Sequence, residues 1–186
     1  MGKTVLLVMD IQNGILDLLG NMEPYLNRLV PVIKSAREAE IPIIYVATGF
    51  RRGYPEASAR NSSTVKVAAW GTFIEGEEST KIHPAVAPVE GDVVVTKRRV
   101  SAFHGTDLDV ILRSMDAETL VITGLISSGV VLSTIRQAAD LDYRLTVLKD
   151  LSMDREPETH DMLVNKVFAK QAQILSSAEW VAELKK

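Results

Sequence analysis

Continuous apolar runs recur along the chain, and polar residues are rare inside them. The runs cover residues 5–9, 41–46, 93–95, 120–122 and 145–148. Strands that are buried on both faces have this pattern, because neither row of side chains meets water. The runs therefore predict the strands of a parallel sheet.

Amphipathic stretches lie between these runs. Apolar residues recur there at three- and four-residue spacing, the period of one helix face, in residues 24–40, 106–115, 128–141 and 157–171. Strands that alternate with helices predict an α/β fold. Right-handed crossovers should place helices on both faces of the parallel sheet.

Individual residues refine the bounds and faces of these helices. Pro24 suits the first turn of the first helix, where its missing N–H has no intrahelical partner to lose. Thr106 is expected to cap the second helix, and a last helix with a serine cap is expected over residues 176–186. The buried face of the first helix should hold Leu26, Leu29, Val30, Ile33 and Ala36.

One long segment, residues 49–88, interrupts the succession of strands and helices. Connections in compact domains are usually only a few residues long, so a segment of this length is commonly an active-site cover or an interface. The chain shows no internal repeat and no linker. Residues 1–186 are therefore expected to form a single domain.

Composition and charge narrow the class of protein. The chain has 21 basic and 24 acidic residues and a formal net charge of −3. Because the basic residues are scattered, nucleic acid is not an expected partner. No run approaches the roughly 20 apolar residues of a membrane span, and no signal-peptide pattern is visible, so we expect a cytoplasmic protein without membrane contact. The absence of cysteine excludes disulfides, thiolate metal sites and thiol catalysis.

Polar residues at the ends of the apolar runs are the first candidates for a functional site. In open parallel sheets, ligands bind beyond the carboxyl ends of the strands. Asp10, followed by Gln12, ends the first run, Lys97 ends the third, and Asp150 ends the fifth. Asp10 and Lys97 could share a proton pathway at neighbouring strand ends, or they could form a simple ion pair that braces the strands.

The turn at residues 124–130 joins the fourth expected strand to its helix. Its amides, at Ser128 and Gly129, could hold negative charge, including that of a developing oxyanion. Its glycines lack the Gly-x-Gly-x-x-Gly spacing, so the turn is a weak signal for a nucleotide. The histidines have no partners at the helical spacing of metal sites, and we expect no metal and no other cofactor; they are His83, His104 and His160.

Three ordered motifs carry a resemblance to a known family. They comprise residues 5–12, residues 92–97 with the Ser101, Ala102, Phe103, Thr106 and Leu108 that follow, and residues 120–124 with Thr134, Arg136 and Ala138. Over nearly its whole length, the chain resembles the isochorismatase-like hydrolases, a superfamily that includes nicotinamidases and N-carbamoylsarcosine amidohydrolase. The resemblance implies a three-layer α/β/α sandwich around a six-stranded, Rossmann-type doubly wound parallel sheet. It also implies a homo-oligomer, either a dimer or a tetramer.

The resemblance further implies roles for individual residues. In members that carry a thiol, the aspartate at the position of Asp10 is a general base, the lysine at Lys97 assists it, and a cysteine attacks an amide carbon. Val130 occupies the position of that cysteine. A valine side chain has no nucleophilic atom, so the covalent route is closed. The family pattern also predicts a non-proline cis peptide, between Ile126 and Ser127.

Two main functions remain open. Isochorismatases also lack the thiol and hydrolyse a vinyl ether with the aspartate acting as an acid. Asp10 and Lys97 could therefore hydrolyse a small molecule by proton transfer alone, with the amides of residues 128–130 holding the polarised oxygen. The alternative is a pseudoenzyme that keeps the pocket as a small-molecule binding or interaction protein. A flavodoxin-like nucleotide binder is a third alternative.

Several further residues are candidates for binding the small molecule. Ser127 or Ser128 could orient water or substrate, but neither is expected to be a nucleophile, because no histidine lies in a recognisable partner motif. Arg51, or Arg52 or Arg60, could hold a substrate carboxylate as a forked donor, or could be a solvated loop arginine. The residues expected to bind the small molecule are Gln12, Arg51, Ser127, Ser128, Gly129 and Val130.

Overall fold

A six-stranded parallel sheet forms the centre of the computed structural model, which describes residues 2–185. Its strands are β1 (Lys3–Met9), β2 (Ile43–Thr48), β3 (Val93–Lys97), β4 (Ala117–Leu125), β5 (Arg144–Met153) and β6 (Gln173–Leu175). They lie in the order β3-β2-β1-β4-β5-β6, and each neighbouring pair is parallel. The predicted doubly wound α/β fold is confirmed.

Each of the five apolar runs falls in a strand, apart from residues 41–42, which precede β2, whereas β6 does not correspond to any run. This strand has only three residues and is half-buried at the edge of the sheet, so it carries no continuous apolar run. Its presence was implied only by the family resemblance. The six-stranded count is therefore confirmed, but periodicity alone found five of the strands.

The α-helices are α1 (Asn13–Leu16), α2 (Glu23–Glu38), α3 (Ser62–Trp70), α4 (Leu108–Ser114), α5 (Leu132–Asp140), α6 (Pro157–Met162) and α7 (Ser177–Glu183). Five of the α-helices lie in the predicted stretches, whereas α1 and α3 were not predicted. A π-helical turn, Ser127–Val131, precedes α5, and residues 163–170 continue α6 as π and 3-10 turns. Two further 3-10 turns, Glu78–Thr80 and Pro84–Val86, lie in the long segment before β3.

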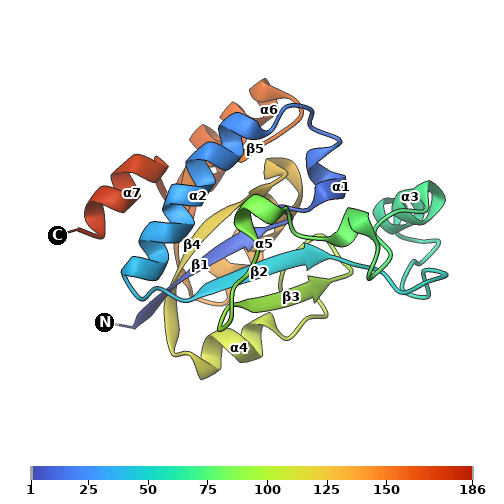
Figure 1. Cartoon of the computed structure of the whole chain (residues 1–186), viewed down its shortest axis with the longest axis horizontal. Coiled ribbons are helices and arrows are strands. Elements are labelled where there is room, and N and C mark those ends of the chain that lie inside the picture. Colours follow the sequence, from blue (N-terminus) through green and yellow to red (C-terminus); the bar gives the residue numbers. More distant parts are fainter. Residues whose placement is uncertain (1, 186) are drawn as a thin grey trace.

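Helices cover both faces of the sheet and make three layers (Figure 1). The helices α2 and α7 pack their buried residues on one face of the sheet. The helices α4 and α5 and the helical residues 157–170 pack on the other face. The side chains of β1 alternate between the two cores: Val5, Leu7 and Met9 face α4 and α5, and Leu6 and Val8 face α2. All five are at most 1% exposed, which explains why the run is continuously apolar.

Two local predictions were wrong. Val30 is 40% exposed, and the buried face of α2 is completed by Tyr25 and Val32 instead. The predicted cap Thr106 also lies outside its helix: α4 begins at Leu108 after an N-cap at Asp107. The Thr106 hydroxyl donates a 2.6 Å hydrogen bond to the carbonyl of Ala102, and it still accepts the N–H of Leu108, the first residue of α4, at 3.3 Å.

The predicted serine cap of the last helix is confirmed. The Ser176 hydroxyl accepts the N–H of Glu179 at 3.2 Å, and the Glu179 carboxylate accepts the N–H of Ser176 at 2.7 Å. This reciprocal capping box satisfies backbone donors that have no partner within the helix. The helix then packs Trp180 onto the core beside α2.

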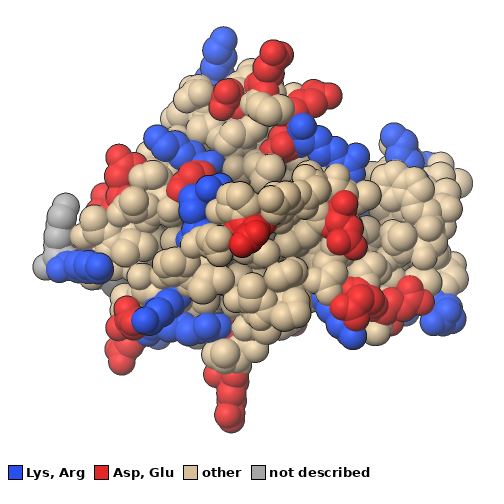
Figure 2. All heavy atoms as spheres, turned by 45° about the horizontal axis from the view of Figure 1, so that its top comes forward, with Lys and Arg blue, Asp and Glu red and all other residues tan. Residues whose placement is uncertain are grey.

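The molecular surface carries both signs of charge. Figure 2 shows acidic and basic side chains interspersed on the face that it presents, as the small net charge of −3 suggests. Within residues 2–185, none of the helices is both long and apolar enough to cross a membrane.

Gly124 lies where β4 closely approaches β1. Its φ is 152°, and a Cβ placed on it would lie 2.7 Å from the carbonyl oxygen of Met9 on β1. Only glycine combines this backbone conformation with so short an approach. Gly124 therefore allows β4 to run beside β1 as far as the carboxyl ends of both strands.

We expect Gly124→Ala to lower the free energy of unfolding by more than about 2 kcal/mol, because both the backbone conformation and the contact with Met9 oppose a side chain. Urea denaturation measures the change. Gly20→Ala is the control: Gly20 has a φ of 81° but no heavy atom within 4 Å of a built Cβ, so strain alone should cost about 1 kcal/mol. Equal losses in the two variants would contradict the close-approach argument.

Candidate functional site

The strand order reverses between β1 and β4, and the candidate site lies at that reversal. Asp10 follows β1, while Thr48, Lys97 and Leu125 end β2, β3 and β4. Connections that leave the two central strands in opposite directions open a crevice beyond their carboxyl ends. A cavity of about 300 Å³ is lined by all four of these residues.

Most of the cavity wall is apolar. Side chains from five separated parts of the chain contribute to it, namely Ile15, Phe50, Val67, Val100, Leu125 and Ile126. The long segment 49–88 supplies Phe50 and Val67, together with Ser63 and Thr64 from α3. This segment therefore forms one wall of the cavity, whereas Trp70 at the end of α3 is 58% exposed and lies outside the lining.

Asp10, Thr48 and Lys97 form one buried polar cluster in this wall. The Lys97 Nζ lies 2.9 Å from Asp10 Oδ2 and donates a 2.7 Å hydrogen bond to the Thr48 hydroxyl. The Thr48 hydroxyl in turn donates to Asp10 Oδ1 at 3.1 Å. The Asp10 and Lys97 side chains are only 7% and 5% exposed. The structure thus brings together the two residues that were predicted to be catalytic.

Burial controls the protonation of Asp10. Loss of water around its carboxyl group raises the pKa of Asp10 above the ordinary value, and this is the largest influence on it. The positive charge of Lys97 and the hydrogen bonds from Lys97 and Thr48 act in the opposite direction without cancelling the effect. Asp10 is therefore more easily protonated than an exposed aspartate and is suited to donate a proton.

The backbone of Asp10 is itself unusual. Its φ is +59°, in the left-handed region, which aspartate tolerates better than most residues. Its N–H donates a 2.7 Å hydrogen bond to the carbonyl of Val46 on β2. Uncommon backbone conformations of this kind persist where the surrounding structure holds them, and they cluster at functional sites.

Gln12 supports the cluster through the backbone of Thr48 and does not line the cavity. It is fully buried, and its side-chain oxygen accepts the N–H of Thr48 at 2.7 Å. Its side-chain nitrogen donates to the carbonyls of Thr48 and Thr80 at 2.9 and 2.8 Å. Gln12 therefore supports Thr48 and lies outside the wall of the cavity.

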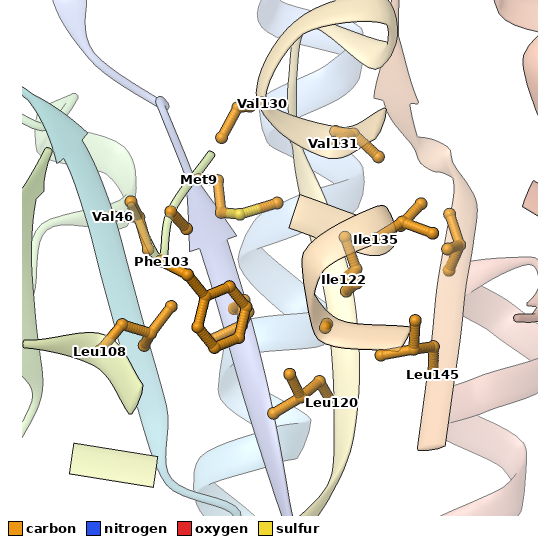
Figure 3. Close-up of a cluster of buried hydrophobic side chains, with 14 of the residues drawn as sticks. Met9, Val46, Phe103, Leu108, Leu120, Ile122, Val130, Val131, Ile135 and Leu145 are labelled. Atoms are coloured by element: carbon orange, nitrogen blue, oxygen red, sulfur yellow. The ribbon is translucent and has the colours of Figure 1, made fainter. Parts of the chain in front are cut away.

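The turn after β4 carries Val130 into the site. Gly129 and Val130 line the cavity, and Val130 is 2% exposed. Figure 3 shows Val130 on this turn at the end of the buried cluster that contains Met9 and Ile122. The carbon-only side chain thus belongs both to the core and to the cavity wall, at the position where the family resemblance places a nucleophile.

Two details of this turn differ from expectation. The cis peptide joins Leu125 to Ile126, one residue earlier than predicted. Two of the three expected oxyanion amides also have protein partners: the N–H of Ser128 donates to Asp154 Oδ2 at 2.7 Å, and that of Gly129 donates to the carbonyl of Ile126 at 3.0 Å. These two N–H groups are therefore engaged within the turn and with the connection between β5 and α6.

Ser127 has the histidine partner that the sequence did not reveal. Its hydroxyl lies 2.7 Å from Nδ1 of His160 on α6. No sequence motif announced this contact, because residues 33 positions apart meet only in the folded chain. Ser127 is nevertheless fully buried and outside the cavity lining, so the pair ties the turn to α6.

Arg51 and Asp150 do not line the cavity. Arg51 is exposed and pairs with Glu56, and Ser128 is likewise outside the lining. Asp150 lies inside β5 and accepts the N–H and hydroxyl of Ser177, at 2.7 and 2.6 Å. The arginines that do line the cavity follow Lys97 directly: Arg98 and Arg99.

No cluster of three or more carboxylate or imidazole side chains that could hold a metal ion occurs within residues 2–185. The cluster of Asp10, Thr48 and Lys97 can take part in proton transfer. Asp10 can hold a proton, and Lys97 and Thr48 can stabilise the carboxylate that remains when the proton leaves.

We expect Thr48→Val to raise the pKa of Asp10 further, because the variant removes a hydrogen bond that stabilises the carboxylate. Lys97→Met should raise it more, since the charge of Lys97 is the larger stabilising influence. Titration of the Asp10 carboxyl carbon by NMR measures both changes. Ser63→Ala, which alters a cavity hydroxyl bonded to Asn61, should leave the titration unchanged. A lowered pKa in either test variant would refute this account of the cluster.

Comparison with known proteins identifies relatives along almost the whole chain. The family profile described as the isochorismatase domain matches residues 4–179. Ureidoacrylate amidohydrolase RutB from Pseudomonas syringae is 30% identical over an alignment of 197 positions, and the alignment covers 94% of this chain and 77% of that protein.

Solved structures agree with this sequence match. An isochorismatase family protein from Burkholderia thailandensis has a TM-score of 0.85 at 26% identity, over 99% of this chain and 96% of that chain. N-carbamoylsarcosine amidase from Thermoplasma acidophilum has a TM-score of 0.76, also at 26% identity, over 94% of this chain and 96% of that chain.

Proposed function

The chain belongs to the isochorismatase family, a family of hydrolases, and from that premise we propose that it hydrolyses a small molecule by acid–base chemistry at Asp10 and Lys97. The proposed reaction forms no covalent thiol intermediate, because the chain has no cysteine. The observation that carries the proposal is the buried contact of 2.9 Å between Asp10 and Lys97 in the wall of a cavity.

The composition of the cavity wall favours one class of reaction. Val130 provides no atom that could attack an amide carbon, and the Ser127 hydroxyl lies outside the cavity. Asp10, by contrast, lies in the wall, and burial raises its pKa, so a larger fraction of it carries a proton near neutral pH. Protonation of an enol ether needs such an acid and no nucleophilic side chain.

The proposed steps balance in atoms and charge. Asp10 transfers its proton to the terminal alkene carbon of the enol ether, and the remaining carbocation is stabilised by the ether oxygen. Water adds to the cation and returns one proton to Asp10. The resulting hemiketal then expels an alcohol and leaves a ketone, so the net reaction consumes one water. Lys97 and the Thr48 hydroxyl stabilise the Asp10 carboxylate between the two proton transfers.

We expect wild-type protein to hydrolyse at least one compound from a panel of enol ethers, amides and ureido compounds. Asp10→Asn should lower kcat/KM for that compound at least about 100-fold, the usual contribution of a positioned acid. Asp142→Asn is the matched control, because Asp142 also has a positive φ, of 65°, and lies just before β5 at the opposite edge of the sheet. The control should retain the activity of the wild type.

The same panel separates the hydrolase from the alternative function. If wild-type protein turns over no compound faster than Asp10→Asn, the hydrolase proposal should be abandoned. The remaining alternative is then a pseudoenzyme that binds a small molecule or a partner protein. The observation that favours this alternative is Val130, which fills part of the cavity wall where a nucleophile would lie.

We expect the rate of enol ether hydrolysis to fall as the pH rises through the pKa of Asp10. The active form is the protonated acid, and burial raises its pKa, so activity should persist above the pH at which an ordinary aspartate loses its proton. A profile of kcat against pH measures this. In Thr48→Val the decline should move to higher pH, because the variant loses a hydrogen bond to the carboxylate. A rate that increases with pH would indicate that Asp10 acts as a base.

The proposal extends to the context in which the protein works. We infer a cytoplasmic homo-oligomer, a dimer or tetramer, built from one domain that spans residues 1–186. Exposed apolar side chains support association: Val94 on the edge strand β3 is 48% exposed, and the nearby Val89 is 51% exposed. Surfaces of this kind commonly pair with another chain.

A further inference from the structure

Three consecutive cations line the cavity where β3 ends. Lys97, Arg98 and Arg99 all contribute to its wall, and Asp10 is the acidic residue of the lining. We propose that the cavity selects a small molecule with an apolar body and one anionic group, such as a carboxylate, and that Arg99 is the cation that selects the anionic group. The proposal rests on the proposed function only for the reaction that follows binding. The selection of an anion is a property of binding and is tested without any reaction.

Lys97 and Arg98 already have carboxylate partners. Lys97 lies 2.9 Å from Asp10. The guanidinium of Arg98 lies 2.9 Å from Glu56 and also pairs with Glu75. Because opposite charges at such distances largely compensate one another, neither residue is the cation available to a ligand.

Arg99 differs because its partners are uncharged. Its guanidinium donates to two backbone carbonyls, that of Arg98 at 2.6 Å and that of Glu56 at 3.1 Å. Within residues 2–185 it forms no ion pair. A guanidinium has five N–H donors, so these two bonds leave donors free for a ligand. The two carbonyls hold the group in place, which reduces the ordering that binding would require.

The surrounding network does not neutralise Arg99 indirectly. Glu56 is shared, because Arg51 and Arg98 both pair with its carboxylate. Glu75 pairs with Arg98. Arg51 and Arg98 therefore share both carboxylates, and the positive charge of Arg99 remains in excess beside the cavity. Apolar walls strengthen the field of such a charge, because they contain few dipoles that could screen it.

The apolar walls determine the rest of the ligand. Phe50, Val67 and Ile126 offer contacts to carbon atoms and few hydrogen bonds. A ligand with many hydroxyl groups would lose its water without finding partners, which makes its binding unfavourable. The combination of one excess cation and apolar walls therefore fits a compact carboxylate with an unsaturated or aromatic body.

The experiment compares the binding of benzoate with that of nitrobenzene by NMR titration of the protein. The two probes have nearly the same shape, but only benzoate is charged, and neither contains a bond that the proposed reaction would cleave. We expect wild-type protein to bind benzoate at least about tenfold more tightly than nitrobenzene. Arg99→Gln should remove most of this preference by weakening benzoate at least about tenfold, while the affinity for nitrobenzene changes less than about twofold.

Two further variants make the result specific. Arg99→Lys keeps the charge and should retain a preference for benzoate, even if Arg99→Gln folds poorly. Arg144→Gln is the matched control, because Arg144 begins β5 and so lies at the end of the sheet opposite the cavity. This variant should bind both probes as the wild type does. In wild type and Arg99→Lys, added salt should weaken benzoate more than nitrobenzene, since screening acts only on the charged probe.

Several outcomes would overturn the proposal. They are equal affinities of the two probes for the wild type, no binding of benzoate, or an unchanged preference in Arg99→Gln. Because benzoate binding needs no turnover, anion selection can be supported even if the protein hydrolyses nothing. Conversely, hydrolysis of a neutral enol ether with no preference for benzoate would support the proposed reaction and reject the anion site.

Discussion

The convergence of parallel strand ends is the constraint on which the rest of the structure depends. The strand order reverses between β1 and β4, so the connections that follow them diverge and leave a crevice at one edge of the sheet. Asp10, Lys97 and Val130 are distant in sequence but border the same cavity there. Gly124 makes this arrangement possible, because its lack of a side chain lets β4 pass close to Met9 of β1.

The ion pair of Asp10 and Lys97 at the carboxyl ends of the strands is better explained by its chemical role than by a contribution to stability. Removing Asp10 and Lys97 from water is costly, and their attraction over 2.9 Å offsets that cost only in part. The hydrogen bonds of Thr48 to both side chains reduce the remaining cost, and Gln12 fixes Thr48 through its backbone. What the protein gains is a carboxyl group whose pKa is raised by burial and whose charged form still has two partners.

The outcome for individual residues shows how far local rules reach. Asp10 and Lys97 were predicted because each closes an apolar run, and both line the cavity. Thr48 obeys the same rule at the end of β2 and was overlooked, although a hydroxyl at a strand end was the available signal. Gln12 and Arg51 were predicted to bind the small molecule but lie outside the cavity wall. The catalytic roles of Asp10 and Lys97, and the binding roles of the other predicted residues, stay predictions until variants are measured.

The sequence by itself determined the α/β class, the resemblance to a hydrolase family and the absence of a thiol at Val130. These follow from periodicity, motif order and residue identity, which are local properties of the chain. Only the tertiary structure decided that Lys97 meets Thr48 across 49 positions and that Ser127 meets His160 across 33. It also decided that Arg99, rather than Arg51, lines the cavity. The direction of a side chain and the partners left to it depend on strand order and burial, which local pattern does not specify.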